Sequence, residues 1–240
     1  MKKFKSAEEK EAFVQATFDR IADHYDLMNK LITFGFDRGW RRKAVHAMDL
    51  RAGSRVLDVA CGTGALELEM LKWHSTLRID ALDFNREMLR VAGENLTEIG
   101  KDQQVELVEA DAMSLPYEKD TFDGAISAFA LRNVPDIQQV LNEMARVTKP
   151  GSWVVTLELA KPTAFGFKQV YHYYFNHIMP YLATKQVGNR SYQWLAESIR
   201  YFPHQDEIAH MFRKAGLEDV SYEGLTGSVV AVHRGRVPHG

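Results

Sequence analysis

The chain has 240 residues, of which 45% are hydrophobic and 26% charged, a globular composition that at this length suits one α/β domain better than two. Its 30 basic and 32 acidic residues give a net charge of -2, so no overall attraction to nucleic acid is expected, and the single cysteine, Cys61, excludes an intrachain disulfide and favours a reducing compartment. No apolar run approaches the roughly 18 residues of a membrane span, and the charged start is unlike a secretory signal, so we expect a cytoplasmic protein that can still touch a membrane surface.

The first fifty or so residues are predicted to form an N-terminal helical cap. In the stretch Ile21–Trp40, apolar side chains recur at the spacing of one helix face. Gly35 and Gly39 then loosen this pattern.

Short apolar runs alternate with helical segments from Arg55 onward. The expected strands are Arg55–Ala60, Ile79–Asp83, Val105–Ala110, Phe122–Phe129 and Trp153–Leu159. The expected helices are Ala65–Trp73, a segment that ends near Asn95, and Ile137–Val147, with a turn at Lys149–Gly151 before the fifth strand. This alternation predicts a parallel sheet with helices on both faces.

Two later segments depart from simple alternation. Phe165–Ala183 is rich in aromatic residues and indicates a helical insertion of about residues 163–200. After a last helix at Gln205–Ala215, the segments Leu217–Tyr222 and Val229–His233 predict an antiparallel hairpin. We therefore expect one α/β domain over residues 1–240, built on a doubly wound, mostly parallel, seven-stranded sheet of the Rossmann-like kind.

The strongest chemical signal is the glycine-containing turn that follows the first strand, Val56–Gly64. Its glycines let the backbone approach a ligand closely, at the strand end where open α/β sheets bind ligands. The third glycine of a dinucleotide fingerprint would fall at Glu67, and a carboxylate there would face a pyrophosphate. Because Asp58 also precedes the turn, a positively charged ligand without phosphate fits better, and S-adenosylmethionine is such a ligand.

Acidic residues also end the next two predicted strands. Asp83 can accept hydrogen bonds from both hydroxyls of a ribose, and Asp111 can meet the amino group of an adenine. Three acids on consecutive strands, together with the glycine turn, favour a nucleoside site over the alternative of merely solvated strand ends.

Two longer motifs carry a resemblance to a known family. Phe18–Asn29, with Phe34, Gly35 and Trp40 after it, and Phe129–Val134, with Arg146–Gly151 after it, resemble the ubiquinone/menaquinone biosynthesis C-methyltransferases (the UbiE/MenG family). The similarity runs from about Phe18 to Gly235. It implies a class I S-adenosylmethionine-dependent methyltransferase. The chain departs from the family pattern at Ala65, Ala128, Ala130 and Ala160.

The resemblance implies methyl transfer to a ring carbon of a prenylated quinol such as demethylmenaquinol, with S-adenosylhomocysteine as the other product. Arg132 is expected to stabilise the phenolate through an ordered water, and Asn133 to orient the water or the ring; the other reading of Arg132 is an ion pair that ties the fourth strand to its loop. Tyr25 is expected to line the acceptor pocket. Asp26 and Asn29 either line it too or belong to a helix packed on the sheet edge.

The residues expected to contact the cofactor lie in the glycine turn and at the neighbouring strand ends. They are Asp58, Ala60, Gly62, Thr63, Gly64, Asp83, Phe84, Met88, Asp111, Ala112 and Ala128.

No metal site is expected. His172 and His177 are five residues apart and share a helical face poorly, and Asp19, Asp23 and Asp26 are better explained as a solvated or capping helix face. The preferred interpretation of the aromatic insertion is a helix that packs in the core or forms a homodimer contact. The second interpretation is a path for a prenyl tail or a contact with a membrane.

Three alternatives to quinol methylation stay open at this point. The first is a methyltransferase for another small-molecule acceptor, which Ala65, Ala128 and Ala160 favour. The second is a non-catalytic cofactor-binding subunit of a quinone-biosynthesis assembly. The third, a nicotinamide oxidoreductase, is disfavoured by Glu67.

Overall fold

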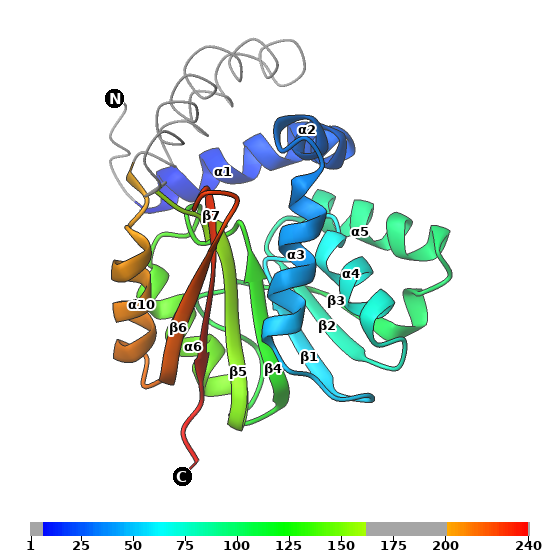
Figure 1. Cartoon of the computed structure of the whole chain (residues 1–240). Helices are drawn as coiled ribbons and strands as arrows, with labels where there is room; N and C mark the ends of the chain where they lie inside the picture. The colour runs from blue at the N-terminus through cyan, green and yellow to red at the C-terminus, as the bar shows by residue number, and fades with distance from the viewer. Residues whose placement is uncertain (1–6, 162–200, 240) are drawn as a thin grey trace.

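A computed structural model describes residues 7–161 and 201–239, which form a seven-stranded sheet between two layers of helices (Figure 1). The strands are β1 (Arg55–Val59), β2 (Arg78–Asp83), β3 (Val105–Glu109), β4 (Phe122–Ala128), β5 (Thr148–Leu159), β6 (Glu218–Leu225) and β7 (Val230–Arg236). The predicted insertion at about residues 163–200 lies outside the described residues.

The sheet is doubly wound, with strand order β3-β2-β1-β4-β5-β7-β6. The five strands β3, β2, β1, β4 and β5 pair in parallel, whereas β7 is antiparallel to both β5 and β6. The predicted mostly parallel sheet and its carboxyl-terminal antiparallel hairpin are therefore confirmed. The strand order reverses between β1 and β4, which is where open α/β sheets bind their ligands.

Helices cover both faces of the sheet. They are α1 (Ala7–Ile21), the 3-10 turn η1 (Ala22–His24), α2 (Tyr25–Ile32), α3 (Phe36–Ala47), α4 (Ala65–Trp73), α5 (Arg86–Glu98), the 3-10 turn η2 (Asp102–Gln104), α6 (Ile137–Val147) and α10 (Gln205–Lys214). On one face α3, α4 and α5 share a buried cluster with β1 and β2, and on the other α6 and α10 pack on β4 and β5. No described helix is long and apolar enough to cross a bilayer.

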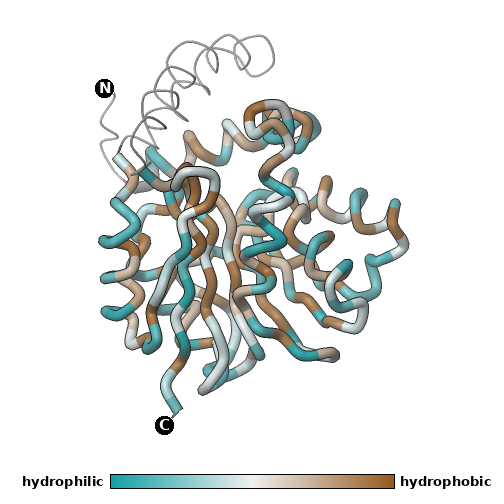
Figure 2. Tube along the Cα trace, viewed as in Figure 1, coloured by the Kyte–Doolittle hydropathy of each residue, from teal (hydrophilic) through white to brown (hydrophobic). Residues whose placement is uncertain are grey.

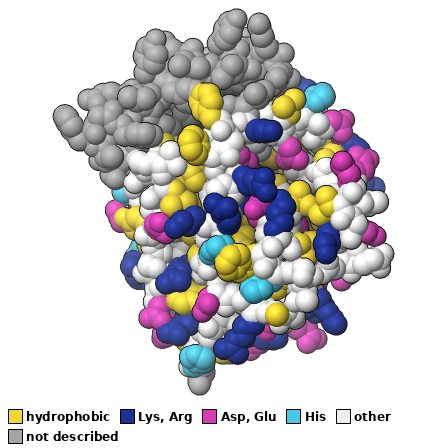
Figure 3. All heavy atoms as spheres, turned by 45° about the vertical axis from the view of Figure 1, so that its right-hand side comes forward, with side chains coloured by type: hydrophobic (Ala, Val, Ile, Leu, Met, Phe, Trp, Pro, Cys, Tyr) yellow, Lys and Arg dark blue, Asp and Glu magenta, His cyan; other side chains and the backbone are white. Residues whose placement is uncertain are grey.

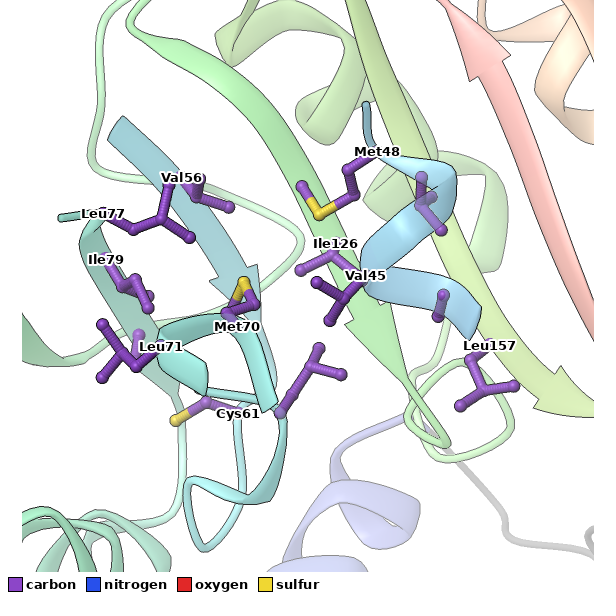
Figure 4. Close-up of a cluster of buried hydrophobic side chains, with 14 of the residues drawn as sticks. Val45, Met48, Val56, Cys61, Met70, Leu71, Leu77, Ile79, Ile126 and Leu157 are labelled. Atoms are coloured by element: carbon purple, nitrogen blue, oxygen red, sulfur yellow. The ribbon is translucent and has the colours of Figure 1, made fainter. Parts of the chain in front are cut away.

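The two hydrophobic clusters follow from the alternation of strand side chains. Val56 and Ile126 point to the face of α3 and α4, where they meet Val45, Met48 and Met70 (Figure 4), while Leu57 and Ala125 point to the opposite face. Apolar residues run along the central strands in Figure 2, because these strands are covered on both sides.

The stretch Ile21–Trp40 comprises the end of α1, η1, α2 and the start of α3. Phe34 and Gly35 have φ of 53° and 75° and turn the chain between α2 and α3, whereas Gly39 lies within α3. One sequence prediction needs correction. Lys149–Gly151 is not a turn outside the sheet but part of β5. Gly151 (φ 80°) donates its N–H to the carbonyl of Val237 at 2.8 Å, so a distant segment holds this irregular stretch in the sheet.

Candidate active site

A pocket opens at the carboxyl ends of the parallel strands, at the point where the strand order reverses. The loops after β1 to β4 form its floor, and α1 and α2 cover it. Its lining residues are Val14, Phe18, Tyr25, Ala60, Gly62, Leu82, Asp83, Phe84, Met88, Ala110, Asp111, Ala112, Met113, Ala128, Phe129, Ala130, Asn133, Val134 and Pro135. A second, smaller cleft shares the wall at Tyr25, Ala60, Gly62, Ala128 and Phe129 and extends beneath the glycine turn.

The glycine turn is shaped by left-handed backbone conformations. Gly62 and Gly64 have φ of 59° and 82°, and Ala60 adopts the same region at 60°, which costs a residue with a Cβ about 1–2 kcal/mol. A Cβ added to Gly64 would lie 3.4 Å from the Ala92 Cβ on α5. The glycine there therefore lets α4 start close to α5 and holds the turn over the end of β1.

Asp83 at the end of β2 is held by backbone donors. The Gly62 N–H donates to Oδ2 at 2.9 Å and the Asn85 N–H donates to Oδ1 at 2.8 Å. Burial nevertheless raises the pKa of Asp83 to about 6, an effect that these N–H groups oppose. Each carboxylate oxygen keeps a further lone pair for a ligand hydroxyl in the pocket.

Asp58 and Glu67 are two buried carboxyls beside the smaller cleft. Their exposed fractions are 1% and 0%, and none of their four oxygens has a hydrogen-bond partner within the described part of the chain. Burial, and for Asp58 also the proximity of Glu67, raises the pKa of both groups, that of Glu67 to about 7. Arg41, which lines the same cleft and pairs with Asp37, opposes both shifts.

The acids of the amino-terminal motif attach α1 and α2 to the site. Thr63 donates its hydroxyl to Asp26 Oδ1 at 2.7 Å, and the Asn85 side chain donates to Asp19 Oδ1 at 2.6 Å. The exposed Asp23 pairs with Arg90 of α5. The expectation of a solvated or capping face holds for Asp23, whereas Asp19 and Asp26 bind the two loops that form the pocket.

Arg132 and Asn133 separate at the end of β4. Asn133 lies in the pocket wall, but the Arg132 guanidinium turns inward, donates to the Phe129 carbonyl at 2.6 Å and lies 3.5 Å from the Glu158 carboxylate on β5. Glu158 Oε1 in turn accepts the Leu131 N–H at 2.7 Å. Arg132 therefore forms an ion pair, as in the alternative reading, but the pair ties the loop after β4 to the neighbouring strand β5, and the hydrogen bond to Phe129 holds the end of β4.

Most of the predicted site residues gather here. Those in the pocket wall are Tyr25, Ala60, Gly62, Asp83, Phe84, Met88, Asp111, Ala112, Ala128 and Asn133. Asp58 and Thr63 line the adjoining cleft, Gly64 caps α4, and Arg132 lies behind the wall. Sequence reasoning missed Val14 and Arg41; only the position of Arg41 directly after the motif residue Trp40 pointed to it.

The donor set fits a cationic adenosyl compound. Asp83 and Asp111 are available to hydroxyl and amino donors, and the unpartnered Asp58 can receive an ammonium, with Arg41 nearby for a carboxylate. Over residues 7–161 and 201–239, no group of three His, Cys, Asp or Glu side chains could hold a metal ion.

Solved structures share this architecture. The Haemonchus contortus phosphoethanolamine N-methyltransferase 2 in complex with S-adenosyl-L-methionine aligns with a TM-score of 0.68 at 16% identity, covering 94% of this chain and 60% of that one. A SAM-dependent methyltransferase from Aquifex aeolicus aligns with a TM-score of 0.61 at 19% identity, covering 82% and 89%. Together with the strand order, these alignments give the chain the fold of the class I S-adenosylmethionine-dependent methyltransferases.

Sequence comparison is more specific. The profile of the ubiE/COQ5 methyltransferase family matches residues 4–237, and the chain belongs to this family. The demethylmenaquinone methyltransferase of Desulfitobacterium hafniense is 43% identical over 235 residues, 97% of this chain and 93% of the relative. That of Bacillus subtilis is 42% identical over 228 residues, 94% and 97%. The family resemblance is confirmed, and by its family and relatives the chain is an S-adenosylmethionine-dependent methyltransferase and not a nicotinamide oxidoreductase.

Proposed function

We propose that this enzyme methylates a ring carbon of a polyprenylated quinol, most closely demethylmenaquinol, in menaquinone biosynthesis. The curated relatives bear that activity in their names. The structural observation that carries the proposal is the aromatic wall of the pocket, where Phe18, Tyr25 and Phe129 lie beside the polar side chain of Asn133. A flat apolar ring with a hydroxyl group is the acceptor that such a wall suits.

The cofactor is assigned to the strand ends by the chemistry of their side chains. Asp83 would accept the ribose hydroxyls, and Asp111 with the Ala112 backbone would meet the adenine, which Phe84 and Met88 flank. Asp58, Gly62 and Thr63 would hold the methionine part in the smaller cleft, whose walls include Ala60 and Ala128, and Gly64 would set the start of α4 beside it. When bound, the cofactor supplies an electrophilic methyl group on a sulfonium.

The remaining residues align the acceptor and keep water out. Tyr25 and Phe129 border both cavities, so they lie where an acceptor ring would meet the methyl group. We assign Asn133 a hydrogen bond to the quinol hydroxyl. Arg132 donates a hydrogen bond to the Phe129 carbonyl, so its role is to position this part of the pocket wall. Its positive charge, which lies behind the wall, also favours the phenolate that develops on the acceptor.

Another small-molecule acceptor is the second candidate. The observation in its favour is that Ala65 and Ala128, two positions where the chain departs from the family pattern, both line the smaller cleft. Ala128 borders both cavities, so its small side chain widens the region where an acceptor would meet the methyl group.

We also propose that the enzyme acts in the cytoplasm and touches the membrane that holds a prenylated acceptor. Leu27 and Phe36 are more than half exposed on α2 and α3. Further along α3, Arg42, Lys43 and His46 line a groove with Arg234 of β7, and Lys and Arg side chains are prominent on this side of the molecule (Figure 3). Cosedimentation with anionic but not zwitterionic vesicles tests the contact.

A homodimer stays a prediction, and the mass of the protein in solution would test it. Nucleic acid is not an expected partner.

The deciding experiment is incubation of purified protein with S-adenosylmethionine and a reduced short-chain demethylmenaquinone analogue, followed by mass spectrometry. We expect one added methyl group on ring carbon. Asn133→Leu should raise the quinol KM and leave cofactor affinity unchanged, whereas Asp83→Asn should weaken cofactor binding. Cofactor binding without quinol methylation, in the presence of detergent or lipid, would contradict the quinol and favour the second candidate.

A further inference from the structure

The buried carboxyls of Asp58 and Glu67 are not explained by the fold. Asp58 belongs to β1, and Glu67 to the first turn of α4, directly after the glycine turn. Both side chains are buried, and the two carboxyls interact with each other. Two ionised carboxylates without donors in such a place would repel each other and lack solvation.

The charges around this pair do not neutralise it. Asp83 faces it from β2, and Cys61 lies in the intervening loop. Asp26 of α2 reaches the same cleft through Thr63. The one cation that faces the pair from the described chain is Arg41 of α3, and it is already engaged by Asp37. The surroundings are therefore short of positive charge.

The pair opens toward a ligand on one side. Asp58 lines the smaller cleft together with Tyr25 and Thr63. This cleft shares Tyr25, Ala60 and Gly62 with the pocket that contains Asp83, the residue to which we assign the ribose. With the adenosine part at Asp83, the methionine part extends into the cleft. Its α-ammonium then supplies the positive charge that the site lacks.

We propose that Asp58 and Glu67 share one proton in the free enzyme and release it when the ammonium of the cofactor or of its product enters the cleft. The O–H bond of the shared proton breaks, the proton passes to solvent, and the charge of the pair changes from -1 to -2 as the ammonium arrives. Burial, which raises the pKa of Glu67 to about 7, puts this exchange in the neutral range. The inference rests on the proposed placement of the cofactor and is independent of the acceptor.

The test is isothermal titration of the full chain with S-adenosylhomocysteine, in buffers of different ionisation enthalpy. Near pH 6 we expect close to one proton released per ligand, and an affinity that rises by up to about tenfold per pH unit before levelling above pH 7. 5′-Methylthioadenosine, which has the adenosine part but no ammonium, should release no proton through the pair. Any titration of Asp83 is common to both ligands and cancels in the comparison.

Glu67→Gln should abolish the extra proton release and flatten the pH dependence of S-adenosylhomocysteine binding. Glu69→Gln, an acid of the same helix that pairs with Arg38 and Lys72, is the matched control and should behave as the wild type. Equal proton release for the two ligands in the wild type would overturn the proposal without any variant. Absence of binding by both ligands would instead contradict the proposed cofactor site.

The free enzyme gives a readout that needs no ligand. A carboxyl whose folded pKa is raised makes the protein less stable as pH rises from its unfolded value through its folded value. Glu67→Gln should therefore be more stable to urea than the wild type at pH 8, with the difference vanishing toward pH 4.5. An equal difference at both pH values would indicate a merely structural role.

Discussion

Arg132 occupies a position where the removal of one side chain has two separable effects. Its guanidinium is the partner of Glu158, whose carboxyl is 1% exposed and whose pKa burial raises. It also holds the Phe129 carbonyl at the pocket wall. Loss of turnover in an alanine variant would therefore not by itself identify a catalytic residue.

We expect Arg132→Ala to lower the free energy of unfolding by about 3–5 kcal/mol, because it leaves the Glu158 carboxyl buried without a cation. Urea unfolding of three variants measures this loss: the single variants Arg132→Ala and Arg132→Lys, and the double variant that combines Arg132→Met with Glu158→Gln. The lysine and double variants should recover most of the loss. If Arg132→Ala is as stable as the wild type yet inactive, the positional role is wrong and a direct catalytic role is favoured.

His233 of β7 is a buried imidazole far from the glycine turn. Its Nε2 lies 2.9 Å from the Gln205 carbonyl, which makes Nε2 the protonated nitrogen, and Phe212 and Tyr222 flank the ring. Burial lowers the pKa of His233 to about 4. The neutral ring therefore contributes to stability above pH 6.5, and this contribution is lost as pH falls toward 4.

The fall in the free energy of unfolding between pH 6.5 and pH 4 should include about 3 kcal/mol from His233. His233→Gln keeps an N–H donor near Nε2 and removes the titration, so its stability should decline less over this range. Denaturant unfolding at several pH values is the measurement. Parallel pH profiles for the two proteins would show that His233 does not titrate as proposed.

At the scale of elements, the sheet could be predicted from the sequence. Its strands are covered by helices on both faces, and such strands appear in the sequence as short apolar runs. The helix Ile137–Val147 was predicted with the bounds it has in α6. Gly35 indicated a break in the helical pattern, and it lies in the turn between α2 and α3, but the bounds of these two helices were not predicted. The Lys149–Gly151 stretch was read as a turn because its partner, Val237, is far away in the sequence.

The attachment of α2 to the glycine turn should affect cofactor binding more than stability. Asp26→Ala removes the acceptor of the Thr63 hydroxyl, and we expect S-adenosylhomocysteine affinity to fall about tenfold, the effect of one hydrogen bond to a charged group. Asp23→Ala, which breaks an exposed pair with Arg90, is the control and should change affinity little. Equal effects of the two variants would indicate general loosening of the N-terminal helices.

At the scale of the whole molecule, the pocket combines segments of two kinds. Asp58, Asp83 and Asp111 could be predicted because the carboxyl ends of parallel strands meet at one edge of a sheet. Val14 could not, since it reaches the site from a helix whose packing on the sheet has no local signal, and for Arg41 the only signal was its place next to the motif residue Trp40. The inward turn of Arg132 was equally hidden, because its partner Glu158 belongs to another strand.

Because the pocket exists only when four strands and the N-terminal helices are assembled, its ligand should stabilise the fold as a whole. S-adenosylhomocysteine at 100 times its Kd should raise the free energy of unfolding by about 2.7 kcal/mol. Thermal denaturation over a range of ligand concentrations measures this. A Tm that stays constant at saturating ligand would contradict a site built from the assembled sheet.

The position of β7 between β5 and β6 has a consequence for biosynthesis. β5 pairs with β7 from Trp153 to Leu159, yet β7 is the last of the seven strands to leave the ribosome. Until β7 is made, one edge of β5 has unpaired backbone N–H and C=O groups and carries apolar residues such as Val155 and Leu157. An unpaired apolar edge strand of this kind tends to pair with other chains and aggregate. During translation the nascent chain must therefore keep this strand from pairing with a neighbouring polypeptide until its own final hairpin arrives.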